Sequence, residues 1–196
     1  MQWRARRGQR VWLDEGLGTH RMKAVWYERN GPAREVLQCG DLPDPVPGTG
    51  EVLVRVHASG VNPSDWKTRS GSRPMVAPRI IPHSDGAGVI ERVGPAVDPS
   101  RVGERVWIWN GQWKRPFGTA ATYIALPSEQ AVRLPDGTTF EAGACLGIPA
   151  LTAHRAVTID VSPRVKASWS QAGRGPWVIT PSSSQGCSEL GRSLPL

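Results

Sequence analysis

The stretches Gly60-Val-Asn-Pro-Ser-Asp-Trp-Lys-Thr-Arg-Ser-Gly71 and Pro82-His-Ser-Asp-Gly-Ala-Gly88 decide the fold of this chain. Each is a polar segment next to a run with the pattern of a β-strand: Glu51–His57 precedes the first, and the second leads into residues 86–93. A rigid sheet holds the loops at its strand ends in fixed positions. We therefore expect the binding chemistry of this chain on these two loops.

Other short strands surround the two loops. In Glu51–His57, every second residue is valine, which is the period of a strand with one buried face. Similar runs predict further strands at residues 22–27, 36–41, 86–93, 102–109 and 119–126. Helices are expected to begin at Thr139 and Ala150, with a break at Gly147-Ile148-Pro149 between them. With 22 Gly and 18 Pro, the pattern favours a mainly β domain with short helices, a barrel or a sandwich.

Length and charge limit the function classes. The 196 residues are enough for one ordinary core but not for two full domains. The net charge of +7 lies mostly in the end segments, since residues 1–21 and 161–196 each carry +3 and leave +1 for the middle. A fold with an almost neutral middle is a poor candidate for nucleic-acid binding. No apolar run reaches the length that a membrane span needs.

The two ends differ from the middle of the chain. Residues 1–21 are rich in arginine and contain no apolar segment of the length a secretory signal needs, so we expect a disordered basic extension. Residues 162–196 show neither helical nor strand periodicity, and we expect residues 158–196 to form a disordered tail. The cysteines at 39, 145 and 187 have no metal-ligand spacing, which predicts reduced thiols and a cytoplasmic location.

The two polar loops and their strands resemble the catalytic domain of the medium-chain dehydrogenase/reductase superfamily. The resemblance covers residues 22–157 and is greatest to the zinc-independent, zeta-crystallin-like quinone oxidoreductase branch. It implies a GroES-like, partly open barrel, which is incomplete here because relatives complete theirs with segments after the cofactor domain. It also implies Met22 as the family's starting residue and a linking helix from Ala150 toward a Rossmann domain that is missing from this sequence.

The tail has a second possible origin in the genetic code. In relatives, a strand, a glycine-rich turn and a helix follow at this point and hold the dinucleotide pyrophosphate. Between Lys166 and Ser184, the last base of each codon and the first two of the next permit Gly-Val-Leu-Val-Thr-Gly-Gly-Ala-Gly-Ala-Val-Gly-His-Tyr-Ala-Ile-Gln-Leu. At Trp177/Val178 the only possible reading is glycine. We therefore expect residues 158–196 to be out of frame, with the frame change between Val157 and Lys166.

The resemblance also names candidate site residues. It places Asn62 and Thr152 toward the nicotinamide, as catalytic and cofactor-binding candidates, and Lys67 toward the substrate, where relatives often have tyrosine. Asp65 would cap or orient the first loop, because aspartate readily bonds nearby backbone groups. The structural alternative for each of the four is a turn residue without a chemical role.

No metal is expected. The zinc ligands of other relatives correspond to Asn62 and Ser84, and neither is a good zinc ligand. His83 is interpreted as a structural residue of the second loop. Trp107, Trp109 and Trp113 would either wall an apolar pocket or pack in the core.

The resulting hypothesis is a truncated, inactive form of an NADPH-dependent oxidoreductase that reduces quinones or enones. In full-length relatives the partner would be a small quinone or enone, NADPH the cofactor and a homodimer the assembly; this chain is expected to bind no cofactor tightly, no nucleic acid and no membrane. One alternative is a free-standing GroES-like interaction module without catalysis. A second is a nucleic-acid binder that acts through its basic ends.

Overall fold

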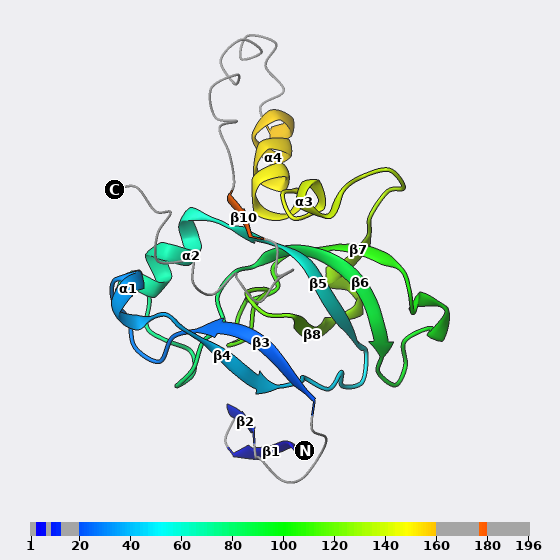
Figure 1. The fold of residues 1–196 in the computed structure, drawn as a ribbon. Coiled ribbons are helices and arrows are strands. Elements are labelled where there is room, and N and C mark those ends of the chain that lie inside the picture. The colour runs from blue at the N-terminus through cyan, green and yellow to red at the C-terminus, as the bar shows by residue number, and fades with distance from the viewer. Residues whose placement is uncertain (1–2, 7–8, 13–19, 160–176, 180–196) are drawn as a thin grey trace.

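The computed structural model describes residues 3–6, 9–12, 20–159 and 177–179 of the chain, which form a mainly β structure with short helices (Figure 1). The strands are β1 (Trp3–Arg6), β2 (Gln9–Trp12), β3 (Arg21–Trp26), β4 (Gln38–Pro43), β5 (Glu51–Val61), β6 (Asp85–Val93), β7 (Arg105–Ile108), β8 (Tyr123–Pro127), β9 (Ala131–Arg133) and β10 (Trp177–Ile179). The α-helices are α1 (Ala33–Val36), α2 (Pro63–Lys67), α3 (Phe140–Gly143) and α4 (Leu151–Ile159). Wider π-type turns follow α2 at Thr68–Ser72 and precede α4 at Leu146–Ala150.

The largest sheet is built on the long strand β5. One edge of β5 pairs with β6, which pairs with β7 and then β9, all antiparallel. Its other edge is shared, because β8 pairs with Glu51–Arg55 and β10 pairs with Ser59–Val61. The first half of β5 therefore lies between two neighbours in the domain, and the last three residues carry a strand from the far end of the chain.

This sheet is strongly curled but does not close. β8 and β9 lie at opposite ends of the strand order, yet they are separated in sequence only by the three-residue 3-10 turn Ser128–Gln130. So short a connection requires the two ends of the sheet to approach each other. Arg101 bridges this junction by donating to the carbonyls of Ser128 and Ala131, at 2.8 and 2.6 Å. The open curl agrees with the predicted partly open, GroES-like domain.

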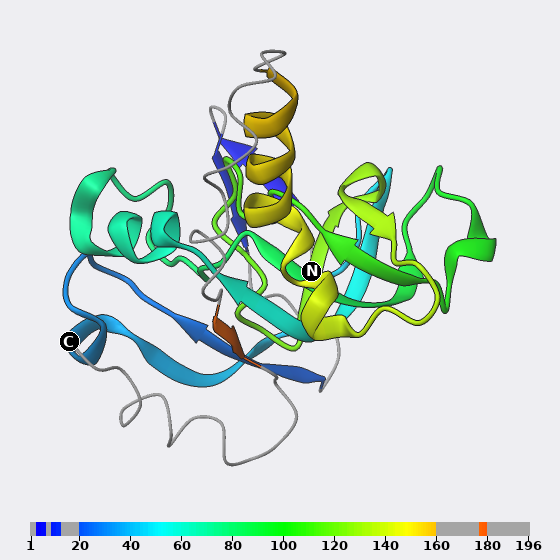
Figure 2. The same cartoon turned by 90° about the horizontal axis from the view of Figure 1, so that it is seen from above.

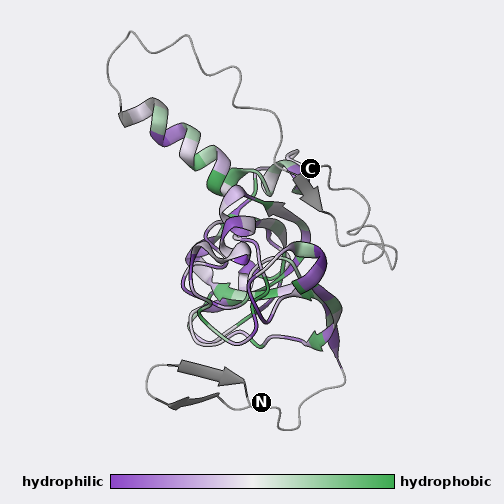
Figure 3. Ribbon diagram, turned by 90° about the vertical axis from the view of Figure 1, so that its left-hand side faces the viewer, coloured by the Kyte–Doolittle hydropathy of each residue, from purple (hydrophilic) through white to green (hydrophobic). Residues whose placement is uncertain are grey.

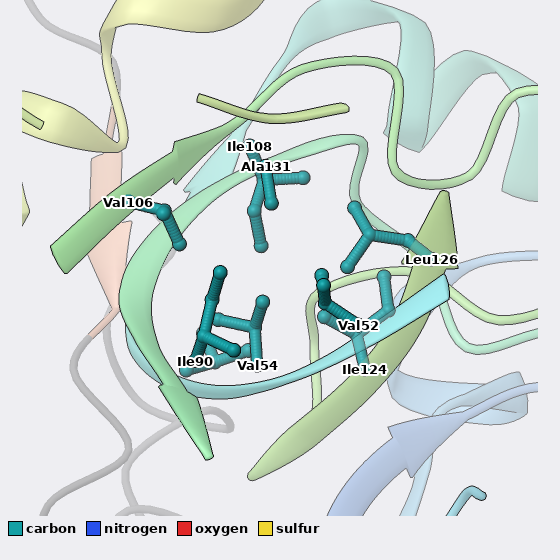
Figure 4. Packing of buried hydrophobic residues seen from close by; sticks show 9 residues of the cluster. Val52, Val54, Ile90, Val106, Ile108, Ile124, Leu126 and Ala131 are labelled. Carbon is teal, nitrogen blue, oxygen red and sulfur yellow. The ribbon is translucent and has the colours of Figure 1, made fainter. Parts of the chain in front are cut away.

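The main core lies inside the curl. Figure 4 shows aliphatic side chains from four strands and from β9 pointing toward one another in this interior. The buried members are Val52, Val54, Val56, Ile90, Val106, Ile108, Ile124, Leu126 and Ala131. These are the inward positions of the alternating strand pattern. Their burial is the dominant favourable contribution to folding, at about 25 cal/mol per Å² of apolar surface.

A second layer is formed by β3 and β4, which pair with each other. The free edge of β3 contacts the segment before β8, where Val25 N donates to Ala120 O at 2.9 Å and Ala24 bridges to Ala121. Met22 and Ala24 are buried there with Leu42. The N-terminal segment of the domain is therefore fixed against the main sheet through one of its loops.

The helices α3 and α4 lie at the end of the main sheet where β5 finishes. At Gly60 a β-carbon would lie 2.5 Å from the carbonyl oxygen of Ala144, so this contact between β5 and the end of α3 requires glycine. From there α4 extends away from the sheets (Figures 1 and 3) and is separated in space from α2 (Figure 2). Two separate helices therefore lie near the end of β5: α2, which follows it in sequence, and α4, which comes after α3.

The structure differs from the sequence predictions in local ways. The strand predicted at 36–41 is divided between α1 and β4, and the polar loop after Gly60 contains the helix α2. Residues 1–21 were expected to lack structure, but β1 and β2 pair in a two-stranded sheet. No strand was predicted after residue 158, yet β10 pairs with β5. The rest of 158–196 beyond Ile159 lies outside the described residues, and with it most of the frame hypothesis.

One of the two cysteines in the described residues departs from the expected reduced state. Cys145 is a free thiol, whereas Cys39 is disulfide-bonded. In the described part of the chain, no helix is both long and apolar enough to cross a membrane.

Candidate functional site

The site begins where β5 ends and α2 starts. Asn62 occupies the N-cap of α2, proline follows it at the first helical position, and Asp65 stands at the third. Asp65 Oδ2 accepts a hydrogen bond from Asn62 N at 2.7 Å, and Asp65 N donates to Asn62 O at 3.0 Å. This reciprocal arrangement satisfies backbone groups that a helix start otherwise leaves unpaired. The result is a rigid position for Asn62, whose exposed fraction is 4%.

Asp85 joins Asn62 to a distant part of the chain. It is the first residue of β6 and lies opposite Gly60 in the pairing with β5, so its side chain is next to the end of that strand. Its Oδ2 accepts from Asn62 Nδ2 and from the backbone N of Ile148, both at 2.8 Å. Its Oδ1 is buried and has no hydrogen-bond partner among the described residues. One carboxyl oxygen therefore holds both the start of α2 and the turn before α4.

Burial changes the titration of both carboxyl groups. Burial raises the pKa of Asp65 to about 7, with a smaller rise from the nearby Asp85 charge and an opposing effect of the Asn62 N–H bond. Burial also raises the pKa of Asp85 to about 6, against the lowering effect of the bonds from Asn62 and Ile148. The site therefore contains two carboxyl groups that change charge near neutral pH.

A second polar network lies behind Asp85. Ser59 Oγ is 2.9 Å from His83 Nδ1 and 2.9 Å from Thr119 Oγ1, and Thr119 Oγ1 donates to Asp85 O. Since the Thr119 proton is used in that bond, Ser59 must donate to Thr119 and accept from His83 Nδ1–H. Burial lowers the pKa of His83 to about 4, which keeps the ring neutral.

This network excludes one type of chemistry. A serine next to a histidine is the arrangement of a hydrolase nucleophile, but there the serine proton must pass to the imidazole. Here the proton lies on His83 Nδ1, and Ser59 is only 3% exposed. The pair is therefore a structural connection between β5 and the second loop.

A pocket of about 340 Å³ lies beside the turn before α4. We call it the α4 pocket; it is lined by Trp109, Asn110, Gly147, Ile148, Leu151, Thr152 and Arg155. An aromatic ring, an amide, a hydroxyl and a guanidinium thus surround one space. Ile148 belongs both to this pocket and to the Asp85 hydrogen bonds, so the pocket is connected to Asn62 through a single carboxyl group.

The predicted site residues are placed as follows. Thr152 lines the α4 pocket, and Asn62 is linked to the same pocket through Asp85. Lys67 is exposed at the end of α2, where its ammonium lies 5.7 Å from the ring centre of Trp66, and it is not a lining residue of the pocket. Asp65 caps α2 as expected for a loop-orienting residue. The catalytic and cofactor roles of Asn62, Lys67 and Thr152 stay predictions.

Sequence reasoning missed Asp85 and Ile148. Both lie in stretches that the sequence marked as loops, but the spacing of 63 residues between them gave no sign of a contact. The three tryptophans considered in the sequence lie in three different environments. Trp109 lines the pocket, Trp113 is 56% exposed, and Trp107 packs against the buried alanine cluster of β5, β6 and α3.

The residues of the α4 pocket fit one end of a nicotinamide cofactor. A flat ring can pack against Trp109, a carboxamide can bond Asn110 or Thr152, and a phosphate can approach Arg155. In the part of the chain that the structure describes, no three His, Cys, Asp or Glu residues are grouped to hold a metal ion.

A second hollow, of about 710 Å³, lies at Ser100–Arg105 and Arg133–Asp136. Its arginines are largely engaged: Arg101 pairs with Glu104 at 2.7 Å, and Arg105 packs over the Phe140 ring. An anion entering this hollow would have to displace those contacts. The α4 pocket is therefore the better candidate site.

Residues 48–136 match the family model described as the alcohol dehydrogenase GroES-like domain. The human quinone oxidoreductase is 39% identical over 144 residues, which cover 71% of this chain and 42% of that protein. The chain thus spans about two fifths of the length of such a relative.

Solved structures agree with this similarity. The quinone oxidoreductase from Coxiella burnetii superposes with a TM-score of 0.64 at 28% identity, over 70% of this chain and 44% of that one. A mycobacterial protein solved in complex with NADPH gives a TM-score of 0.61 at 32% identity, over 72% and 41% of the two chains.

Proposed function

Since this chain belongs, through its GroES-like domain, to the quinone oxidoreductase branch of the medium-chain dehydrogenase/reductase superfamily, we propose that the domain forms the nicotinamide-facing and substrate-facing side of an NADPH-dependent quinone or enone reductase. The observation that carries the proposal is the α4 pocket, whose turn shares Asp85 with Asn62. The quinone substrate follows from the names of the relatives, and NADPH from the mycobacterial complex.

NADPH, when bound, supplies the hydride, so the residues of this chain have to bind and orient rather than to react. Trp109 and Ile148 offer apolar walls that exclude water from the ring. Thr152 and Asn110 offer hydrogen bonds for its carboxamide, and Arg155 offers a positive charge. In this proposal the protein contributes mainly position, which lowers the entropy that the transition state must lose.

The proposed reaction uses no metal. Asn62 and Ser84 stand where the resemblance places zinc ligands, and the Asn62 amide nitrogen already donates to Asp85. An amide and a hydroxyl are weak zinc ligands beside cysteine, histidine or carboxylate. Asn62 is therefore proposed as a hydrogen-bonding residue.

The chain of 196 residues by itself is proposed to be inactive. The described residues contain no glycine-rich turn with a helix start for the cofactor pyrophosphate. The codons possible from Lys166 to Ser184 permit such a motif in the alternate frame, and we propose that residues 158–196 are out of frame. Without residues that bind its phosphates, NADPH would dissociate from the α4 pocket too quickly for turnover.

The test is an assay of NADPH oxidation with 1,4-naphthoquinone by two proteins. One is the 196-residue chain, and the other is expressed from the same gene with the alternate frame restored after Val157. We expect oxidation above background only for the frame-restored protein. Turnover by the 196-residue chain would overturn its proposed inactivity, and a gene without the glycine-rich codons would overturn the frame change.

A free-standing interaction module is the second candidate. Leu151 on α4 is 46% exposed, and five successive residues from Leu151 to Arg155 are classed as exposed. A monodisperse chain that unfolds cooperatively and still fails to bind a nicotinamide nucleotide would favour this candidate over the oxidoreductase domain.

A further inference from the structure

We propose that Asp85 is a positioning residue, which sets the orientation of the Asn62 amide and the start of α4 together. The inference rests on the proposed function, because it assigns a task to those two parts of the site. It adds a residue that the resemblance did not supply. Asp85 is fully buried and lines neither hollow described above, so it would act only through its neighbours.

The Asn62 amide is oriented by its bond to Asp85. A carboxamide can be turned by 180° with little change of shape, and its hydrogen-bond partners decide which end is the donor. An ionised carboxylate only accepts, so Asp85 Oδ2 selects the nitrogen of Asn62 for its own side, at 2.8 Å. The oxygen of the Asn62 amide must then point the other way. Asp85 therefore determines which end of the buried Asn62 amide faces β6.

The same carboxyl group holds the turn before α4. Gly147 interrupts it with ψ of −111°, and Pro149 has no N–H to donate, so the turn lacks much of the regular helical bonding. The hydrogen bond from Ile148 N to Asp85 Oδ2 fixes it to the sheet instead. A β-carbon on Gly147 would lie 2.1 Å from Asp85 Oδ1, which shows how closely the carboxyl group is seated against this turn.

Because Asn62 and Ile148 donate to the same oxygen of Asp85, a change at Asp85 affects both residues together. Protonation of the carboxyl group weakens acceptance by Oδ2 from Asn62 and Ile148 together. The titratable groups whose pKa the Asp85 charge raises are Asp65 from α2 and Cys145 from the end of α3. Because α4 begins at Leu151, directly after the turn, the position of Thr152 in the α4 pocket depends on the same contact.

The test uses the ¹⁵N-labelled 196-residue chain in nuclear magnetic resonance. Over pH 4.5 to 8, we expect the Asn62 side-chain amide and the Ile148 backbone amide to shift with one common midpoint. In Asp85→Asn neither signal should follow that titration. Binding of reduced nicotinamide mononucleotide, a probe without the pyrophosphate, should weaken about tenfold, the loss expected when a buried donor is left unpaired.

Asp98→Asn is the matched control, since Asp98 is an exposed carboxylate that accepts from Ser100 in a surface turn. It should leave the common midpoint and the probe affinity unchanged. If Asp85→Asn does not fold, Asn62→Ala replaces it. Removing that donor should raise the midpoint at Ile148 by about one pH unit, because the ionised carboxylate loses one stabilising bond.

Two results would overturn the positioning role: different midpoints at Asn62 and Ile148, or a folded Asp85→Asn variant that binds the probe as the wild type does. An unchanged midpoint at Ile148 in Asn62→Ala would contradict the coupling in the same way. If the wild type shows the common midpoint but no probe binding at any pH, the proposed function fails while the coupling through Asp85 stands.

Discussion

The α2 side and the α4 side of the candidate site are built differently. On the α2 side, Asn62, Asp65 and Asp85 are all buried, and Asn62 donates hydrogen bonds to both carboxyl groups. On the α4 side, the residues from Leu151 to Arg155 are exposed, although Thr152 and Arg155 line the pocket. The two sides are connected through Ile148 and the carboxyl group of Asp85.

The buried residues of the α2 side make their hydrogen bonds within the domain, whereas the exposed residues of the α4 side are accessible to a ligand. On the α2 side the helix start is capped and most polar groups are paired, with Asp85 Oδ1 as the exception among the described residues. The α4 side carries apolar and cationic residues on a projecting helix. We therefore expect large effects on stability for changes at buried positions, and effects on ligand binding alone for changes at the exposed residues of α4.

The largest contrast is expected between two leucines. Leu126 is fully buried in the main core, and its replacement by alanine should lower the free energy of unfolding by about 2 to 5 kcal/mol. Leu151→Ala should change it by less than about 0.5 kcal/mol, as is typical of surface positions. Denaturant unfolding of both variants measures this contrast. A loss of several kcal/mol in Leu151→Ala would show that α4 packs far more closely than described.

A pH effect of about 3 kcal/mol is expected from Asp85. Its folded pKa of about 6 lies above the ordinary aspartate value of 3.8, so the folded protein holds the proton more strongly. This contribution to stability is full below pH 4 and is lost as the pH rises through about 6. His83 acts in the opposite direction, because its folded pKa of about 4 is below the ordinary histidine value of 6.5.

The difference between wild type and Asp85→Asn isolates this contribution, because that of His83 cancels. We expect the stability of the wild type relative to the variant to fall between pH 4 and 7. Unfolding free energies at four or five pH values are sufficient. A difference that does not depend on pH would mean that Asp85 titrates as it does in the unfolded chain.

A smaller loss, of about 1 to 3 kcal/mol, is expected for Gly147→Ala. The new methyl group would overlap Asp85 Oδ1 and force the turn away from the carboxyl group. Gly48→Ala is the control, because its methyl group would meet only the flexible end of Glu51, at 3.2 Å. Equal stability of Gly147→Ala and wild type would contradict the close seating of Asp85.

The smallest effects concern the two other predicted site residues. Thr152→Val should weaken binding of reduced nicotinamide mononucleotide about twofold to tenfold, the value of one hydrogen bond, without a change in stability above about 0.5 kcal/mol. Lys67→Ala should change neither, because Lys67 is exposed and lies over Trp66. Titration of both variants by nuclear magnetic resonance measures the difference. A larger effect of Lys67→Ala on this binding would contradict the expectation and place Lys67 near the nicotinamide.

The strands of the core were predictable because their chemistry is local. The alternation of Val52, Val54 and Val56 marks β5 without knowledge of its neighbours, and Thr139 caps α3 where its residue type predicts. The helix α2 was not predicted, although Asn62, Pro63 and Asp65 are residues typical of a helix start. It was missed because a five-residue helix is too short to show periodicity.

The site itself was predictable only in part. Asn62 and Thr152 were identified through the family resemblance, not through any pattern that places them near one pocket. Asp85 was missed because its importance arises from the register of β6 against β5 and from a contact with Ile148. Such a contact depends on tertiary structure, and one sequence carries no local sign of it.

The central claim is that the α4 pocket faces the nicotinamide. The most direct test is the measurement of intermolecular nuclear Overhauser effects between the C4 hydrogens of reduced nicotinamide mononucleotide and the labelled chain. The account predicts contacts with Thr152 and Ile148. Contacts confined to the hollow at Arg101 and Arg133, or the absence of any contact at millimolar ligand, would contradict it.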